Sequence, residues 1–180
     1  MRRLILVSVL VLLAATAYRS IGLPTTERAS PTLAGPAPNV GDEASTFVHE
    51  LYDGSGTFDL SERGIYVLTF WDTLNQDSNQ ARPYFARLAE DFEGSGVSFA
   101  AVYIGDPPDD AEPASYAVLK DADGKLADLY NEKRVPRNFV ISDEQVYLVH
   151  NNFLPENYEI LRETLTGLVS PDGDTERVEG

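Results

Sequence analysis

Hydrophobic residues in the middle of the chain follow two patterns, continuous runs and a helical spacing. Residues 65–71 and 97–104 are almost entirely apolar or β-branched, which is typical of strands buried on both faces of a sheet. Between them the pattern predicts a helix that ends at a Gly-Ser-Gly stop. Its apolar positions recur at i, i+3 and i+4, at Tyr84, Phe85, Leu88, Ala89 and Phe92. The order strand, helix, strand predicts a βαβ unit.

Short strands and turns flank this unit on both sides. Upstream, residues 47–51 and 56–60 surround the turn signal Asp53-Gly54 and predict a β-hairpin. Downstream, the pattern predicts a turn with a short helix, a second hairpin and an amphipathic helix, at residues 121–130, 139–149 and 160–168. The last helix is expected to start after Pro155-Glu156. This order predicts a mixed α/β sandwich with helices on both faces of one sheet.

Both ends of the chain differ in composition from the middle. Residues 1–17 begin with Met-Arg-Arg, continue as an aliphatic run and end in small residues, which predicts an export signal, either cleaved or retained as a single membrane anchor. Residues 18–39 are rich in Pro, Thr and Ala and predict a linker, and residues 170–180 predict a disordered acidic tail. One domain is therefore expected at residues 40–169, outside the cytoplasm in the periplasm or cell envelope.

The amino-acid composition excludes several classes of function. The 180 residues include no cysteine, two histidines and one methionine, which excludes disulfides, thiolate nucleophiles and thiolate or His-rich metal sites. The 14 basic residues stand against 29 acidic ones, for a formal charge of −15. Such a charge disfavours nucleic acids and anionic membranes as partners and favours basic clients. No cofactor and no metal is predicted.

Several short motifs occur in a fixed order along the domain. A lead-in segment at residues 40–47 precedes the first hairpin turn, residues 70–78 begin at the end of the first core strand, and residues 135–141 form a Pro-containing strand. Together they resemble the extracytoplasmic thioredoxin-like thiol–disulfide oxidoreductases, or redoxins, related to the alkyl hydroperoxide reductase and thiol-specific antioxidant proteins. The resemblance implies a thioredoxin-like three-layer α/β/α sandwich with an N-terminal β-hairpin.

The same resemblance predicts that one helix is reduced. Most of these domains carry a second helix between the strand that corresponds to residues 97–104 and the next strand. Residues 106–115 leave little room for it, so this second helix is expected to be shortened or missing. Pro113, Tyr116 and neighbouring loop residues are then expected to cover the sheet, or to leave an exposed contact patch.

Both redox cysteines of the family are replaced in this chain. Asn75 and Ser78 stand in their positions, and Leu74 stands where the family has a tryptophan. In an active member the first thiolate is stabilised at a helix N-terminus and the second thiol resolves the mixed disulfide. An amide and an alcohol cannot carry out this exchange, so no catalytic residue is predicted. Asn75, Asp77 and Ser78 are expected to cap the helix instead.

Two other candidate sites compete with simpler interpretations. A serine nucleophile at Ser78 needs a base, and His49 and His150 are the only histidines that can approach it in space. The sequence Asp121-Ala122-Asp123-Gly124 is similar to the start of a calcium loop, but Lys125 stands where an oxygen ligand is needed. A plain turn is therefore expected there.

The predicted binding rim joins the former redox segment to the proline loop. The bond between Val135 and Pro136 is expected to be cis, which in this fold exposes the preceding backbone to an extended peptide. The rim residues are Trp71, Leu74, Asn75, Ser78, Val135, Pro136 and Arg137.

Three kinds of function fit these features. The first is a redox-inactive extracytoplasmic module that binds a protein or peptide client at this rim. The second is an enzyme, either one that uses Ser78 or a redoxin-family oxidoreductase. The third is an accessory subunit in an envelope thiol–disulfide or cytochrome-maturation pathway.

Overall fold

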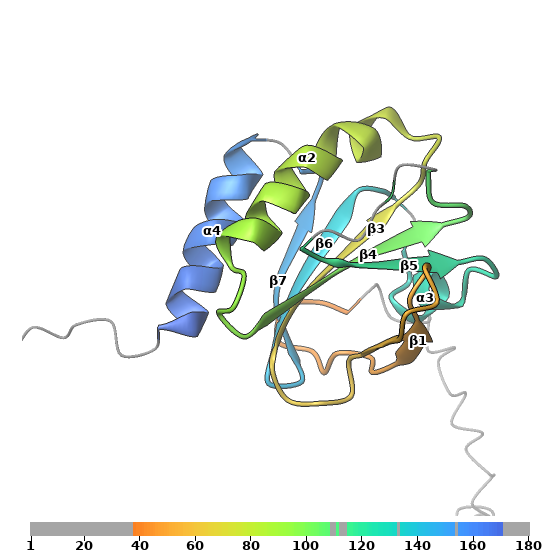
Figure 1. Cartoon of the computed structure of the whole chain (residues 1–180). Helices are drawn as coiled ribbons and strands as arrows, with labels where there is room; N and C mark the ends of the chain where they lie inside the picture. Colours follow the sequence, from red (N-terminus) through yellow and green to blue (C-terminus); the bar gives the residue numbers. More distant parts are fainter. Residues whose placement is uncertain (1–37, 109–110, 112–114, 133, 154, 171–180) are drawn as a thin grey trace, which may run out of the picture. The chain divides into compact units, whose positions relative to one another are not determined.

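A computed structural model describes residues 38–108, 111, 115–132, 134–153 and 155–170 (Figure 1). The predicted export signal, nearly all of the linker and nearly all of the acidic tail lie outside these residues. Within the described part, no helix is both long and apolar enough to cross a membrane. The elements in chain order are β1 (Val48–Glu50), β2 (Thr57–Asp59), β3 (Ile65–Trp71), α2 (Gln76–Asp91), β4 (Val97–Ile104), β5 (Ala117–Asp121), α3 (Lys125–Leu129), β6 (Arg137–Ser142), β7 (Gln145–Asn151) and α4 (Pro155–Val169).

Five strands form one mixed sheet in the order β5-β4-β3-β6-β7, and β1 and β2 form a separate hairpin. Strand β4 runs parallel to both β3 and β5, whereas β6 is antiparallel to β3 and β7. Phe70 near the end of β3 is in register with Val102 of β4 and Arg137 of β6. All of β3 after Ile65 is buried, as its continuous apolar run predicts for a central strand.

Helices and the hairpin cover the two faces of this sheet, which gives the three layers that the resemblance implied. Figure 1 shows α2 and α4 side by side on one face, with α3 and the hairpin on the other. Alternate residues of β3 supply the two cores, because successive side chains of a strand point to opposite faces. The core under α2 and α4 includes Val67, Trp71, Phe85, Tyr103, Leu161 and Leu165. The opposite core includes Phe58, Leu68, Phe70, Leu126 and Tyr130.

The connection from β4 to β5 is trimmed as predicted. None of its described residues is helical, and Tyr116 lies over the sheet in place of a helix. The Tyr116 ring centroid is 5.1 Å from that of Phe85 and 6.3 Å from that of Trp71. Pro113, the other residue expected to cover this surface, lies outside the described residues.

The start of α4 differs from the prediction. The helix begins at Pro155 itself and not after Glu156. Proline suits the first helical position, because its fixed φ is already helical and the N–H it lacks would have no partner within the helix.

A hydrogen bond joins the two helices on the same face and leads to a stability prediction. The Tyr158 hydroxyl donates to the Asp91 carboxylate, and the Arg87 guanidinium lies 5.2 Å from the centroid of the Tyr158 ring. Tyr158→Phe removes the hydrogen bond and keeps the ring, so we expect the free energy of unfolding in urea to fall by about 1 kcal/mol. Tyr147→Phe is the control, because this ring is 53% exposed on β7. Equal losses for the two variants would contradict a specific α2–α4 bond.

Candidate functional site

The loop that follows β3 is held in place by a set of local hydrogen bonds. The Asp72 carboxylate accepts from the Leu74 N–H at 2.8 Å, and the Asp72 carbonyl accepts from the Asn75 N–H at 3.0 Å. The Asn79 side-chain amide donates to the Thr73 carbonyl at 2.9 Å. Together these bonds fix the backbone from the end of β3 into the first turn of α2.

The two positions that hold cysteine in the family now stabilise the start of α2. Asn75 is the N-cap, and its Oδ1 accepts from the Ser78 N–H at 2.9 Å, so the predicted capping role of Asn75 is confirmed. Ser78 acts differently from the prediction, because its Oγ accepts from the Asp72 N–H of the loop at 3.3 Å. Asp77 lies exposed in the first helical turn, where a negative charge is favourable beside the positive end of the helix dipole.

The cap leads to a second stability prediction. Asn75→Ala removes the acceptor for the Ser78 N–H, and we expect the free energy of unfolding to fall by about 1 kcal/mol. Asn75→Asp keeps an acceptor at the same place and is expected to restore most of this loss. Chemical denaturation of the three proteins tests this, and an Asn75→Ala protein as stable as the unmodified one would show that the cap contributes nothing.

The geometry does not support a serine nucleophile. Ser78 is only 1% exposed, so a substrate cannot reach its hydroxyl without displacing the loop. In the described part of the chain, His49 hydrogen-bonds to the Glu50 carbonyl, and His150 to the Asn151 carbonyl and the Asn157 side chain. Neither histidine is therefore in place as a base for Ser78.

The loop that contains Val135 and Pro136 lies on the β6 side of the carboxyl end of β3. Val135–Pro136 is a cis peptide, as expected. Because Phe70 pairs with Arg137, the antiparallel register places Pro136 beside Trp71, directly before the loop that carries Asn75. The structure thus brings the two predicted segments of the rim together at the carboxyl end of the central strand β3.

A buried glutamate that the sequence analysis missed supports the proline loop. The Glu132 side chain has no exposed area, and its Oε1 accepts from the Arg134 N–H at 2.6 Å. The Arg137 Nε lies 3.7 Å from Glu132 Oε2, and the Arg137 guanidinium carbon lies 5.2 Å from the Phe139 ring centroid. Glu132 therefore ties the chain on both sides of Pro136. Its place after a short helix gives no sign of burial in the sequence.

Burial separates the predicted rim residues into a floor and a surface. Trp71, Ser78 and Pro136 are buried, so they are not available for direct contact with a ligand. The Trp71 ring is fully buried against Phe85, Tyr103 and Tyr116. Leu74, by contrast, is 95% exposed. Asn75, Val135 and Arg137 are half-buried and complete the surface.

A groove that the sequence did not reveal lies on the β4 side of the same loop. It has a volume of about 520 Å³ and is lined by Asp72, Thr73, Leu74, Ile104, Gly105, Asp106, Pro107 and Pro108. The Thr73 hydroxyl donates to the Asp106 carbonyl at 2.6 Å and so joins the two walls. Lys120 forms an ion pair with Asp106. The hydrogen bond to Asp106 and its charge raise the pKa of Lys120.

The possible calcium loop is a turn, as expected. The two oxygens of the buried Asp121 carboxylate accept from the Leu126 and Ala127 N–H groups, at 3.1 and 2.8 Å. Asp123 pairs with Lys125, and the hydrogen bond to Lys125 lowers the pKa of Asp123. The described residues contain no group of three or more metal-ligating side chains.

Several solved structures similar to this chain are thioredoxins or thiol:disulfide interchange proteins. A proposed thiol:disulfide interchange protein DsbE from Chlorobium tepidum is 25% identical over 74% of this chain and 99% of its own, with a TM-score of 0.65. A thiol:disulfide interchange protein from Bacteroides sp. is 14% identical over 78% and 96%, with a TM-score of 0.60. The exposed lipoprotein thioredoxin Etrx1 from Streptococcus pneumoniae strain TIGR4 is 20% identical over 69% and 100%, with a TM-score of 0.55. No protein-family model and no curated protein matches the chain.

The thioredoxin-like fold class predicted from the sequence is confirmed by these structures. The resemblance to thiol–disulfide oxidoreductases is confirmed as well, although this chain contains no cysteine. The comparisons concern the fold. What the altered site does has to be argued from its own geometry.

Proposed function

We propose that this cysteine-free, thioredoxin-like domain is a redox-inactive extracytoplasmic module that binds a protein or peptide at the rim formed by Leu74, Asn75, Val135 and Arg137. The observation that carries the proposal is the 95% exposure of Leu74 on a loop fixed by hydrogen bonds. A large apolar side chain held rigidly in water is unfavourable for an isolated domain and favourable as a preorganised anchor for a partner.

Loss of thiol chemistry follows from the residues at the redox positions. Asn75 Oδ1 and Ser78 Oγ both accept backbone hydrogen bonds, and neither group exchanges electrons with a dithiol. Binding does not require those sulfurs. Trp71 and Pro136, which form the floor of the rim, are buried, and in this proposal they support the exposed residues that contact the client.

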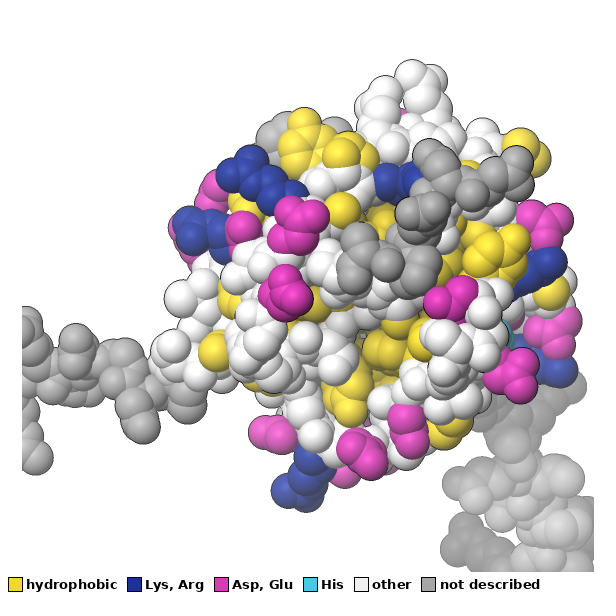
Figure 2. All heavy atoms as spheres, in the orientation of Figure 1, with side chains coloured by type: hydrophobic (Ala, Val, Ile, Leu, Met, Phe, Trp, Pro, Cys, Tyr) yellow, Lys and Arg dark blue, Asp and Glu magenta, His cyan; other side chains and the backbone are white. Residues whose placement is uncertain are grey.

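Charge indicates which kind of client fits best. Asp72 and Asp106 border Leu74 along the groove, and the whole chain has a formal charge of −15. Acidic side chains are also spread over the face shown in Figure 2. We therefore expect a client segment that places an apolar side chain against Leu74 and a lysine or arginine near the two aspartates, with an affinity that weakens as salt rises.

The proposed location outside the cytoplasm rests on two observations. Residues 1–17 have the layout of an export signal, and one structure of this fold is an exposed lipoprotein thioredoxin. Protease protection of the full chain in intact cells tests this. Digestion only after the outer barrier is opened supports a periplasmic domain, and protection until the inner membrane is lysed contradicts it.

A peptide selection tests the proposed binding surface. Random 12-residue peptides displayed on phage are selected on the full chain, and the affinities of the enriched peptides are then compared between variants. Leu74→Asp is expected to weaken binding at least about tenfold, because it removes an apolar anchor and adds a charge. Leu129→Asp is the matched control, since Leu129 is also exposed, at 42%, but lies on α3. No enrichment, or equal affinities of all three proteins, would contradict the proposal.

A further inference from the structure

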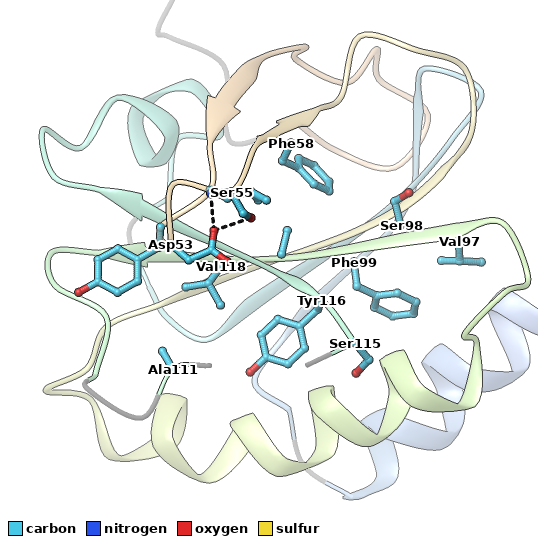
Figure 3. Close-up of a pocket in the computed structure, with 13 residues that line it drawn as sticks. Asp53, Ser55, Phe58, Val97, Ser98, Phe99, Ala111, Ser115, Tyr116 and Val118 are labelled. Carbon is cyan, nitrogen blue, oxygen red and sulfur yellow. Dashed lines mark hydrogen bonds between the residues drawn. The ribbon is translucent and has the colours of Figure 1, made fainter. Parts of the chain in front are cut away.

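A second pocket lies at the opposite end of β4 from the groove, near the edge of the sheet (Figure 3). Its volume is about 390 Å³, and its walls come from the β1–β2 hairpin, the start of β4 and the segment that enters β5. It exists because the strands are staggered. Strand β4 begins at Val97, but β5 first pairs with it where Ala117 meets Ala100. The first residues of β4 therefore lack β5 as a neighbour, and space remains beside them.

The walls of this pocket are mainly aromatic and aliphatic. Phe58, Phe99 and Val118 are buried at its surface. Figure 3 shows Phe99 and Tyr116 on the side of α2 and Phe58 on the side of the hairpin, so rings approach the pocket from both faces of the sheet. The space-filling view in Figure 2 shows a hollow on this face of the molecule with an apolar floor. A volume and lining of this kind are typical of sites for small organic molecules.

One fixed charge faces this apolar space. Asp53 is the acidic residue among the described residues that line the pocket, and these include no lysine or arginine. Its Oδ1 accepts from the Ser55 N–H at 2.9 Å and from the Ser55 hydroxyl at 2.7 Å, as Figure 3 shows. The hydrogen bonds from the Ser55 hydroxyl and N–H lower the pKa of Asp53, so the carboxylate is ionised at neutral pH.

We propose that this pocket binds a small organic cation whose apolar body is about the size of a benzene ring. The ring would lie between Phe58, Phe99 and Tyr116, and the ammonium group would lie against the Asp53 carboxylate. A neutral ligand offers the carboxylate no opposite charge, and an anion is repelled by it. The exposed Tyr52, another lining residue, adds a ring face that attracts cations. The acidity of the whole chain raises the local concentration of cations further.

Three probes of the same shape and different charge test this site: 4-phenylbutylamine, 4-phenylbutan-1-ol and 4-phenylbutyrate. Each is titrated into the isotope-labelled full chain at pH 7, and amide shifts in the NMR spectrum give the affinity and the location. We expect the amine to bind about fivefold more tightly than the alcohol, as one exposed charge pair allows, and the acid to bind least. The largest shifts are expected at Ser55, Ser98 and Tyr116.

A matched pair of variants isolates the role of Asp53. Asp53→Asn is expected to abolish the preference for the amine over the alcohol, and asparagine is compatible with the same turn. Asp59→Asn removes an equal charge from an aspartate that accepts the same two bonds, from the Ser61 N–H and hydroxyl, but does not line the pocket. It is expected to keep the full preference.

Several results would overturn the proposal. They are an absence of binding by all three probes, equal affinities for the amine and the alcohol, or an equal loss of preference in the two variants. Shifts that gather at residues 72–74 would place the probes at the groove beside Leu74 and would also overturn it. Because the pocket and the rim are separate surfaces, failure here leaves the proposed peptide binding intact.

Discussion

Replacing Asn75 and Ser78 together with cysteine is expected to give this domain the thiol–disulfide activity that it lacks. The two side chains sit at the N-cap and in the first turn of α2, the spacing that lets two thiols close a disulfide at a helix N-terminus. Free N–H groups and the helix dipole there stabilise a thiolate at position 75. With dithiothreitol as electron donor, we expect insulin reduction at least about tenfold above the uncatalysed reaction, and no increase for the unmodified chain.

Single substitutions provide the controls for this experiment. Asn75→Cys alone can form a mixed disulfide but has no second thiol to resolve it, and Ser78→Cys alone places a thiol at a position that is only 1% exposed in the unmodified chain. Neither is expected to raise the rate. A double variant that forms no internal disulfide would contradict the geometry of the loop. Insulin reduction by the unmodified chain would contradict the assignment of a redox-inactive domain.

Truncation of Trp71 is expected to have the largest effect on stability. The side chain is fully buried at the end of β3, and its ring centroid lies 5.3 Å from those of both Phe85 and Tyr103. Trp71→Ala removes these edge-to-face contacts and leaves a cavity, so the free energy of unfolding is expected to fall by about 3–5 kcal/mol. Urea denaturation followed by circular dichroism measures this loss.

Two further substitutions show whether the loss comes from packing. Trp71→Phe keeps an aromatic ring and is expected to cost less than Trp71→Ala, because it leaves a smaller cavity. Leu74→Ala, three positions along the chain, alters a side chain that is 95% exposed and is expected to change stability by less than about 0.5 kcal/mol. Comparable losses for Trp71→Ala and Leu74→Ala would contradict the division of the rim into a buried floor and an open surface.

The sequence was sufficient to predict the elements whose signals are local. The apolar run of β3 and the i, i+3, i+4 spacing of α2 need no knowledge of distant residues, and both elements are present. The cap at Asn75 was also predictable, because an N-cap acceptor satisfies an N–H only three residues ahead. The reduced crossover followed from its length once it was compared with the family that the sequence resembles.

Features that depend on contacts within the folded domain were missed. The apolar run of residues 65–71 predicted a strand buried on both faces, and Trp71 is buried as its last residue, but a run without alternation does not tell which of the two cores the ring enters. The burial of Glu132 was also missed, because its own stretch of sequence gives no sign of it. The groove and the second pocket each need residues from segments far apart in the chain. Only the assembled sheet brings their walls together.

The central claim is that the rim still binds a client although its sulfur chemistry is lost. The most direct test is to map the contact of a selected peptide on the labelled full chain by amide chemical shifts, in the presence of dithiothreitol. Shifts are predicted to gather at residues 72–79 and 134–137, the segments on either side of the end of β3. Shifts confined to another surface, such as β7 or α3, would contradict the claim.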